Sequence, residues 1–148
     1  MTTATFYIIE PDSQADSPQG FQDYVLYLLK HFVSQGARIY LHTDDRQDAE
    51  SWDDFLFQQD NDAFIPHNLT GEGPRQGTPV EIGFLPAHLS RNRNLLINVS
   101  NNETNFARSV HQVVDFVPCD EKAKHTARER YKIYRQAGYQ MQTITIKK

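Results

Sequence analysis

The sequence has a single cysteine, Cys119, among 148 residues. One cysteine excludes an internal disulfide and a metal site built from several cysteines, and it fits a reducing compartment, so a cytoplasmic location is expected. The longest purely apolar or aromatic run, residues 25–29, is far too short to span a bilayer, and no cationic residue precedes the first apolar stretch. The sequence therefore predicts a protein that is neither embedded in a membrane nor exported.

Motifs for catalysis and metal binding are also missing. The six histidines form no H-x-x-x-H or comparable cluster, so no metal site is expected and each histidine is interpreted as structural. No serine stands in a G-x-S-x-G elbow, and no pair of carboxylates for acid–base work can be inferred. The sequence therefore predicts a protein without catalytic residues, metal or cofactor.

The stretch PHNLTGEGPRQGTP, residues 66–79, is rich in glycine and proline. Its glycines are spaced as GxGxxxG, and no lysine follows Gly77, so neither a dinucleotide fingerprint nor a Walker A loop is present. A strand rather than a helix is expected next, which offers no helix N-terminus to a phosphate. We therefore predict a structured surface loop. The alternative is a nucleotide-binding α/β enzyme that uses PHNLTGEGPR as its phosphate loop.

The charges are distributed unevenly along the chain. The net charge of −4 argues against tight binding to a phosphate backbone, so no direct high-affinity contact with nucleic acid is expected. Residues 44–62 carry eight acidic side chains against one base, whereas residues 122–148 carry eight bases against one acid. Such asymmetry is typical of a surface with a charged partner, although two solvated faces of opposite sign give the same pattern.

Hydrophobic periodicity predicts alternating strands and helices. Short β-branched or aromatic runs predict strands at residues 5–9, 38–42, 80–84, 94–99, 112–117 and 142–146. Helical spacing predicts helices from residue 21 to Gly36, from a cap at Asp44 or Asp45 through Leu56, and over residues 121–137. A short apolar piece at 63–65 and a helical turn at 105–109 complete the pattern. This order predicts one α/β domain over residues 1–148, with a mainly parallel sheet covered by helices on both faces.

The last predicted helix has two distinct faces at about 100° per residue. One face is expected to pack against the sheet, and it carries Ala123, Ala127, Arg130, Tyr134 and Ala137. The other face is expected in water, and it carries Lys124, Arg128, Tyr131, Lys132 and Arg135. Cations at successive i,i+4 positions repel one another and no acid lies within this arc, so we expect an acidic partner.

Two stretches and the opening ATFYII resemble a known family. FIPHNLTGEGPRQGTPVEI and VVDFVPCDEKAKHTARERYKIYRQAG are similar to the chi subunit of bacterial DNA polymerase III, and the likeness runs from residue 4 to about residue 143. It is weakest between Pro11 and Asp62. The resemblance implies a Rossmann-like, doubly wound fold without a working nucleotide site. It also implies two partners: the psi subunit of the clamp loader and the acidic C-terminal tail of single-stranded DNA-binding protein, which ends in Pro-Phe.

The resemblance also implies which residues bind these partners. The residues that match the family's tail-binding positions are Val117, Lys124, Arg128, Tyr131 and Lys132. The cations would pair with the tail's carboxylates, while Tyr131 and Val117 would hold its terminal aromatic ring. Phe64 matches a position of the psi-binding surface. A helicase that competes with psi for this surface is a further candidate partner. Phe57 stands where family members can carry Trp, so the resemblance implies that it also belongs to the psi-binding surface. The helix around it matches the family poorly, and the alternative is that Phe57 lies in the core.

The sequence thus leads to a two-sided, non-catalytic replication adaptor that couples the polymerase to coated single-stranded template. A nucleotide-binding enzyme is the alternative, as described above. Direct binding of single-stranded DNA by the basic helix is the third interpretation. It is weakly supported, because Tyr131 is the one aromatic residue of this face on which a base could stack.

Overall fold

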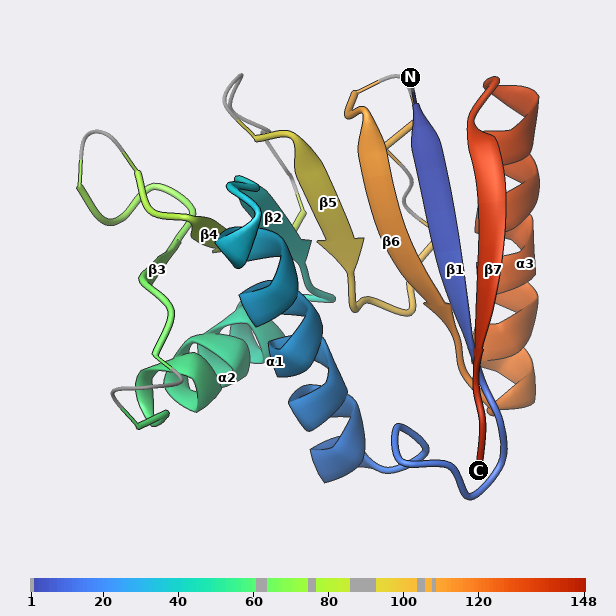
Figure 1. Ribbon diagram of the computed structural model, residues 1–148, viewed down its shortest axis with the longest axis horizontal. Coiled ribbons are helices and arrows are strands. Elements are labelled where there is room, and N and C mark those ends of the chain that lie inside the picture. The colour runs from blue at the N-terminus through green and yellow to red at the C-terminus, as the bar shows by residue number, and fades with distance from the viewer. Residues whose placement is uncertain (1, 61–63, 75–76, 86–92, 104–105, 108) are drawn as a thin grey trace. The chain divides into compact units, whose positions relative to one another are not determined.

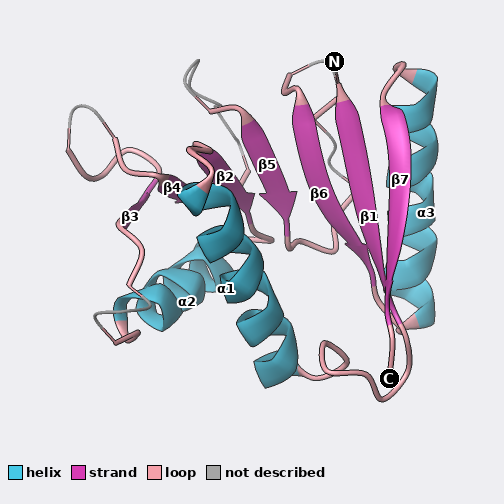
Figure 2. Ribbon diagram, viewed as in Figure 1, coloured by secondary structure: helices cyan, strands magenta, loops and turns pink. Residues whose placement is uncertain are grey.

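The computed structural model describes residues 2–60, 64–74, 77–85, 93–103, 106–107 and 109–148. Helices and strands alternate at the beginning and the end of the chain, whereas in its middle four strands follow one another with no helix among the described residues between them (Figure 2). The chain divides into two compact units, which we call the terminal unit (residues 1–25 and 101–148) and the central unit (residues 26–100). The strand pairs within each unit are parallel, so the predicted α/β class is confirmed. The assignment of residues 1–148 to one domain stays a prediction.

The terminal unit is built on three parallel strands in the order β6-β1-β7 (Figure 1). They are β6 (Gln112–Val117), β1 (Thr3–Ile9) and β7 (Gln140–Ile146). The long helix α3 (Glu121–Gln136) connects β6 to β7 and packs against both strands. The first turns of α1 (Pro18–Ser34) belong to the same unit.

Alternating side chains of β1 contact helices on opposite faces of this sheet. The Phe6 ring lies 5.2 Å from the Tyr131 ring and 6.3 Å from the Tyr134 ring, both of α3. The Tyr7 ring lies 5.8 Å from the Tyr24 ring of α1. Because neighbouring strand residues point to opposite faces, α3 and the start of α1 cover different faces. The expected double covering is therefore present in the terminal unit.

The central unit has four parallel strands in the order β3-β4-β2-β5. They are β3 (His67–Leu69), β4 (Val80–Gly83), β2 (Ile39–His42) and β5 (Leu95–Asn98). Every residue of β2 and β5 is buried, as expected for inner strands of a parallel sheet. Helix α2 (Arg46–Phe57) contacts β3 and β4, and its buried residues are Ala49, Trp52 and Leu56.

The boundaries agree closely with the sequence in most elements, and β3 is the main correction. The sequence predicts a loop at residues 66–79, yet His67 to Leu69 pair with Val80 to Ile82 of β4. This pairing depends on partners 13 residues away rather than on local strand propensity. Helix α1 starts at Pro18 instead of Phe21, because Ser17 Oγ accepts the Gly20 N–H at 3.0 Å and caps it.

Parts of two predicted elements fall outside the described residues. They are Ala63 of the apolar piece at 63–65, and residues 105 and 108 of the turn at 105–109. None of the helices in the described ranges has the length and apolar character needed to cross a lipid bilayer.

Both ends of α3 follow the sequence signals. Asp120 caps the start, where its carboxylate accepts the Ala123 N–H at 3.0 Å. The helix ends at Gln136, and Gly138 follows with φ of 95°, a left-handed conformation that glycine adopts without a steric penalty. Four of the five residues of the predicted packing face, Ala123, Ala127, Arg130 and Tyr134, are buried, whereas Ala137 follows the last helical residue and is half-buried.

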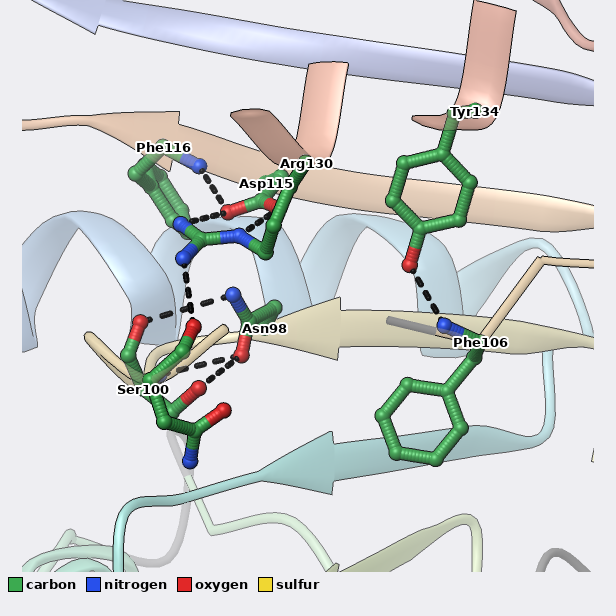
Figure 3. A network of polar contacts seen from close by, with 8 residues as sticks. Asn98, Ser100, Phe106, Asp115, Phe116, Arg130 and Tyr134 are labelled. Carbon is green, nitrogen blue, oxygen red and sulfur yellow. Dashed lines mark hydrogen bonds and ion pairs between the residues drawn. The ribbon is translucent and has the colours of Figure 1, made fainter. Parts of the chain in front are cut away.

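A buried ion pair joins α3 to β6 (Figure 3). Arg130 Nε donates to Asp115 Oδ2 at 2.8 Å, Arg130 Nη2 donates to Asp115 Oδ1 at 3.0 Å, and both side chains are almost fully buried. Arg130 Nη1 also donates to the Asn102 carbonyl at 2.8 Å. One turn later along α3, Tyr134 Oη accepts the Phe106 N–H at 3.0 Å. These contacts fix both the depth and the rotation of α3 on the sheet.

We predict that Asp115→Ala lowers the free energy of unfolding by about 3–5 kcal/mol, because it leaves a buried guanidinium without its counter-charge. The measurement is urea denaturation followed by circular dichroism. Glu129→Ala, which removes an exposed carboxylate from the same helix, serves as the control and should change stability by less than about 1 kcal/mol. The double variant Asp115→Leu/Arg130→Met should recover part of the loss. An Asp115→Ala protein as stable as the wild type would show that this pair does not hold α3.

Candidate functional sites

The terminal unit contains a pocket of about 390 Å³ between α3 and the ends of strands β1 and β6. Four of the five residues predicted for tail binding line it, namely Val117, Lys124, Arg128 and Tyr131. Val117 is the last residue of β6, while the other three lie on successive turns of α3. The fold therefore brings an apolar strand end and a basic helix face into one cavity.

Sequence reasoning missed the other residues of this pocket. They are Phe6, Ile8, Ile9, Glu10, Pro11 and Thr143. Phe6 and Thr143 are paired across β1 and β7, so they share a sheet face with Ile8. The alternation of side chains along β1 is thus the sequence signal that could have identified Phe6 and Ile8 as residues of the pocket. Glu10 directly follows β1, and no pattern in the sequence marks it as part of the pocket.

The cations of the pocket differ in how freely they can bind a ligand. Lys124 Nζ lies 3.6 Å from Glu121 Oε1, and its side chain is 28% exposed. Arg128 is exposed, and no carboxylate in the described part of the chain lies within ion-pair distance of it. A guanidinium offers two parallel donors to a carboxylate. Arg128 is therefore the best placed group in this pocket to receive a carboxylate ligand.

Lys132 differs from the other predicted tail-binding residues. It lies one turn beyond Arg128, outside the pocket lining, and its Nζ lies 3.3 Å from Glu129 Oε1. The sequence argument placed no acid within the cationic arc, yet the side chains of Glu121 and Glu129 reach Lys124 and Lys132 from outside it. The basic face is thus partly neutralised by its own helix, and the expectation of an acidic partner rests on the charge that is left, chiefly that of Arg128.

Tyr131 forms the aromatic wall of the pocket. Its half-buried ring makes an edge-on contact with the Phe6 ring. The guanidinium of Arg135, also on α3, lies 6.0 Å from the centroid of the Tyr131 ring. An aromatic ring held in this way offers a rigid apolar surface with little loss of side-chain entropy on binding. Tyr131 and Val117 therefore give the pocket its apolar character beside the two cations.

Cys119 lies just after β6, and its Sγ donates to the Ile9 carbonyl at 3.2 Å. Desolvation raises the pKa of this thiol, and a hydrogen bond and negative charge from Asp16 raise it further, although Lys124 acts in the opposite direction. The thiol is therefore protonated at neutral pH and is a poor nucleophile.

A second candidate site is an exposed aromatic pair in the central unit. Phe57, the last residue of α2, is 72% exposed, and Phe64 is 42% exposed. Their ring centroids lie 6.4 Å apart in an edge-on arrangement. Core positions are thereby excluded for both residues. An exposed pair of large aromatic side chains is the kind of feature that anchors protein–protein interfaces.

His67 holds the Phe64 segment against α2. Its side chain is only 3% exposed, and its Nε2 lies 3.2 Å from both the Asp53 carbonyl and Asp53 Oδ1. Its Nδ1 lies 2.8 Å from the Ile65 carbonyl, and its ring lies 5.7 Å from the Phe64 ring. His67 therefore bridges the two segments that carry the aromatic pair, consistent with the structural role expected from the sequence.

The glycine-rich stretch is filled by its own side chains around Gly73, whereas residues 69–72 line a pocket of about 210 Å³. Asn68 Nδ2 donates to the Glu72 carbonyl at 2.7 Å, and Thr78 Oγ1 donates to Asn68 Oδ1 at 2.5 Å. A Cβ at Gly73 would lie 2.7 Å from the Asn68 side chain, so the backbone there offers no open cradle for a phosphate. The described residues that follow form strand β4. Arg75, the last residue of the proposed phosphate loop, lies outside the described residues.

Metal binding also lacks support in the described ranges. They contain no group of three or more His, Cys, Asp or Glu side chains placed to hold an ion. The two sites with distinctive chemistry are therefore the basic pocket of the terminal unit and the aromatic pair of the central unit.

These features define a parallel α/β protein with surfaces suited to binding other macromolecules. Residues 1–142 match the family described as DNA polymerase III chi subunit, HolC. The chain therefore belongs to this family of replication accessory subunits.

Individual relatives support the same assignment. The chain is 37% identical over 147 residues to DNA polymerase III subunit chi of Escherichia coli, covering 99% of this chain and 100% of that protein. It is 33% identical to the subunit chi of Haemophilus influenzae, covering 97% of each protein. With the subunit chi of Pseudomonas aeruginosa it shares 29% identity over 96% of this chain and 95% of that one.

A solved structure supports the fold class alone. The crystal structure of T4 UvsW matches with a TM-score of 0.56 at 9% identity. The match covers 99% of this chain but only 42% of that longer chain.

We predict that His67→Ala destabilises the protein by about 1–3 kcal/mol, because it removes a buried imidazole together with the hydrogen bond that its ring N–H donates to Ile65 or Asp53. Hydrogen exchange of the backbone amides at residues 64, 65 and 67 should become faster, residue 66 being a proline without an amide hydrogen. Urea denaturation and exchange mass spectrometry measure the two effects. His125→Ala, at an exposed position of α3, is the control and should change neither quantity. Unaltered exchange at residues 64–67 would mean that His67 does not fix the aromatic pair.

Proposed function

We propose that this chain is a two-sided, non-catalytic adaptor of the bacterial cytoplasm. The basic pocket of the terminal unit binds the acidic C-terminal tail of single-stranded DNA-binding protein. The Phe57–Phe64 pair of the central unit binds the psi subunit of DNA polymerase III. The adaptor thereby couples the polymerase holoenzyme to coated single-stranded template. A helicase that carries a similar anchor competes with psi for the same pair.

One observation carries the tail-binding proposal. Val117, Lys124, Arg128 and Tyr131, which the resemblance implies as tail-binding residues, line a single pocket. Val117 comes from a strand and the others from a helix, so chain proximity alone does not account for their meeting. The tail-binding proposal is thus supported by the geometry of the pocket as well as by the resemblance to the family.

The chemistry of the pocket suits a peptide that ends in an aromatic residue. The terminal ring occupies the apolar space between Val117 and Tyr131, and the terminal carboxylate receives two donors from Arg128. Lys124 is partly engaged by Glu121 and adds a weaker attraction. Lys132 lies outside the pocket and meets acidic residues further from the peptide's end. Each element of the tail therefore has a counterpart of suitable charge or polarity.

The psi-binding proposal rests on exposure. Large aromatic side chains are rarely left this exposed in pairs unless a partner covers them, and Phe57 and Phe64 contact each other at the end of α2. His67 fixes their geometry before binding, which reduces the entropy lost when a partner docks. The pair therefore has the properties of an interface anchor.

For the pocket, we predict that a peptide with acidic residues and a Pro-Phe terminus binds less tightly as salt rises, because exposed charge pairs are screened over about 8 Å at physiological ionic strength. Arg128→Ala should weaken binding by about tenfold or more, and Lys124→Ala by less, since losing a charge-assisted hydrogen bond costs about 1.5–3 kcal/mol. Removing the terminal Phe should weaken binding at every salt concentration, because that loss is apolar burial.

Isothermal titration calorimetry measures these affinities. Lys122→Ala, which removes an exposed cation of α3 outside the pocket lining, controls for net charge and should bind almost as the wild type does. Salt-independent binding, or equal affinities for the Arg128→Ala and Lys122→Ala proteins, would contradict the proposal.

For the aromatic pair, we predict that Phe64→Ala and Phe57→Ala each weaken psi binding by 2 kcal/mol or about thirtyfold while the domain stays folded, since exposed anchors of interfaces can contribute this much. Titration calorimetry measures the affinity and circular dichroism the fold. Tyr27→Ala removes another exposed aromatic residue, 62% exposed on α1, and should leave psi binding intact. Wild-type affinity of both Phe variants would remove the basis for this surface.

A further inference from the structure

The aromatic pair continues into an acidic stripe along α2. Glu50, Asp54 and Phe57 follow one another at i, i+4 and i+7, so they lie on the same side of the helix. All three side chains are exposed. Asp60, three residues beyond Phe57, is exposed as well. A partner that covers Phe57 must therefore come close to several carboxylates.

These carboxylates are not paired with a cation, and the one base of their helix stands at its start. The side chains of Glu50, Asp54 and Asp60 form no ion pair within the described part of the chain. Arg46 is the single base of α2, and its guanidinium lies over the Phe84 ring at 5.6 Å. Arg46 stands one turn before Glu50, and the two residues line the same pocket, so Glu50 has a cation nearby. From Asp54, at 1.5 Å per residue, Arg46 stands about 12 Å along the helix, beyond a Debye length in physiological salt.

The α3 surface shows the opposite arrangement. There Glu121 and Glu129 lie within 4 Å of Lys124 and Lys132, so part of the positive charge is compensated within the protein. On α2, Glu50 and Asp54 are like charges at i, i+4, which repel each other by a few tenths of a kcal/mol. A bound partner with cationic side chains would replace that repulsion with attraction.

We propose that the partner of the Phe57–Phe64 pair docks through a basic segment, in which an apolar anchor is flanked by Lys or Arg. The anchor packs on the two rings, and the flanking cations face Glu50, Asp54 and Asp60. This inference rests on the proposed function of the pair as the psi-binding surface, and it specifies the chemistry that psi must present there. Charge complementarity carries it, since apolar contact alone would not select a basic partner.

The same stripe excludes other ligands from this surface. Single-stranded nucleic acid would bring its phosphates against the carboxylates, and an acidic tail would meet like charge around the rings. The two binding sites therefore discriminate by opposite signs of charge, so neither partner can occupy the other's site without repulsion.

The first experiment titrates purified psi into the full-length chain at low and at physiological salt. Asp54→Lys and Glu50→Lys should each weaken binding about threefold or more at low salt, with a smaller effect at higher salt. Asp54→Asn should fall between Asp54→Lys and the wild type. Asp23→Lys, which reverses an exposed carboxylate on the part of α1 in the terminal unit, is the matched control and should bind as the wild type does.

The outcomes separate the inference from the function it rests on. If Phe64→Ala loses psi binding while Asp54→Lys and Glu50→Lys match Asp23→Lys, the surface binds psi without using its charge and the basic-segment proposal is overturned. If Phe64→Ala also binds normally, psi docks elsewhere and the proposed function of the pair fails.

A second experiment tests the chemistry without psi. A random 12-residue peptide library on phage is selected on the wild-type chain, with counter-selection on the Phe57→Ser/Phe64→Ser variant. The surviving peptides should carry an aromatic or aliphatic residue flanked by Lys or Arg, and they should lose affinity for the Asp54→Lys chain. Survivors without an excess of basic residues, or the recovery of none, would overturn the proposal.

Discussion

The ion pair between Arg130 and Asp115 determines how the basic face of α3 is presented. Both side chains are buried, and the pair joins the middle of α3 to β6 with two hydrogen bonds. Because successive residues of a helix are about 100° apart, holding Arg130 against the sheet sets the directions of Arg128 and Tyr131. A buried ion pair contributes little net stability compared with a well-packed apolar pair, but it tolerates few alternative geometries. Its value here lies in fixing the rotation of the helix that forms the pocket wall.

The two candidate sites share a design although their chemistry differs. Each places aromatic or apolar surface beside charges that are mostly of one sign, with Glu10 as the exception in the basic pocket. Each is held by a nearly buried polar side chain, Arg130 in one case and His67 in the other. Such supports position the binding residues before a partner arrives, so less entropy is lost on docking. The two sites use different residues in different units of the chain. Occupation of one therefore requires no residue of the other.

The sequence predicted the elements whose signals are local. The strand Gln112–Val117 and the helix beginning at Glu121 were correct because β-branched runs, an Asp cap and a terminal glycine act on neighbouring residues. Strand β3 was missed because it exists through pairing with β4, and Glu10 was missed because β1 ends beside α3 only after folding. The ion pairs of Lys124 and Lys132 were missed because long side chains reach beyond the arc assigned to each residue. Sequence patterns thus carried no information on strand pairing between distant segments or on how far a long side chain extends.

The most direct test of this account is a crystal structure of the chain bound to an acidic peptide that ends in Pro-Phe. We expect the terminal ring between Val117 and Tyr131, and the terminal carboxylate within hydrogen-bonding distance of the Arg128 guanidinium. The Arg130–Asp115 pair should remain as it is in the free protein, because the pocket is formed before binding. A peptide bound elsewhere on the chain, or an α3 that rotates to admit it, would contradict the account.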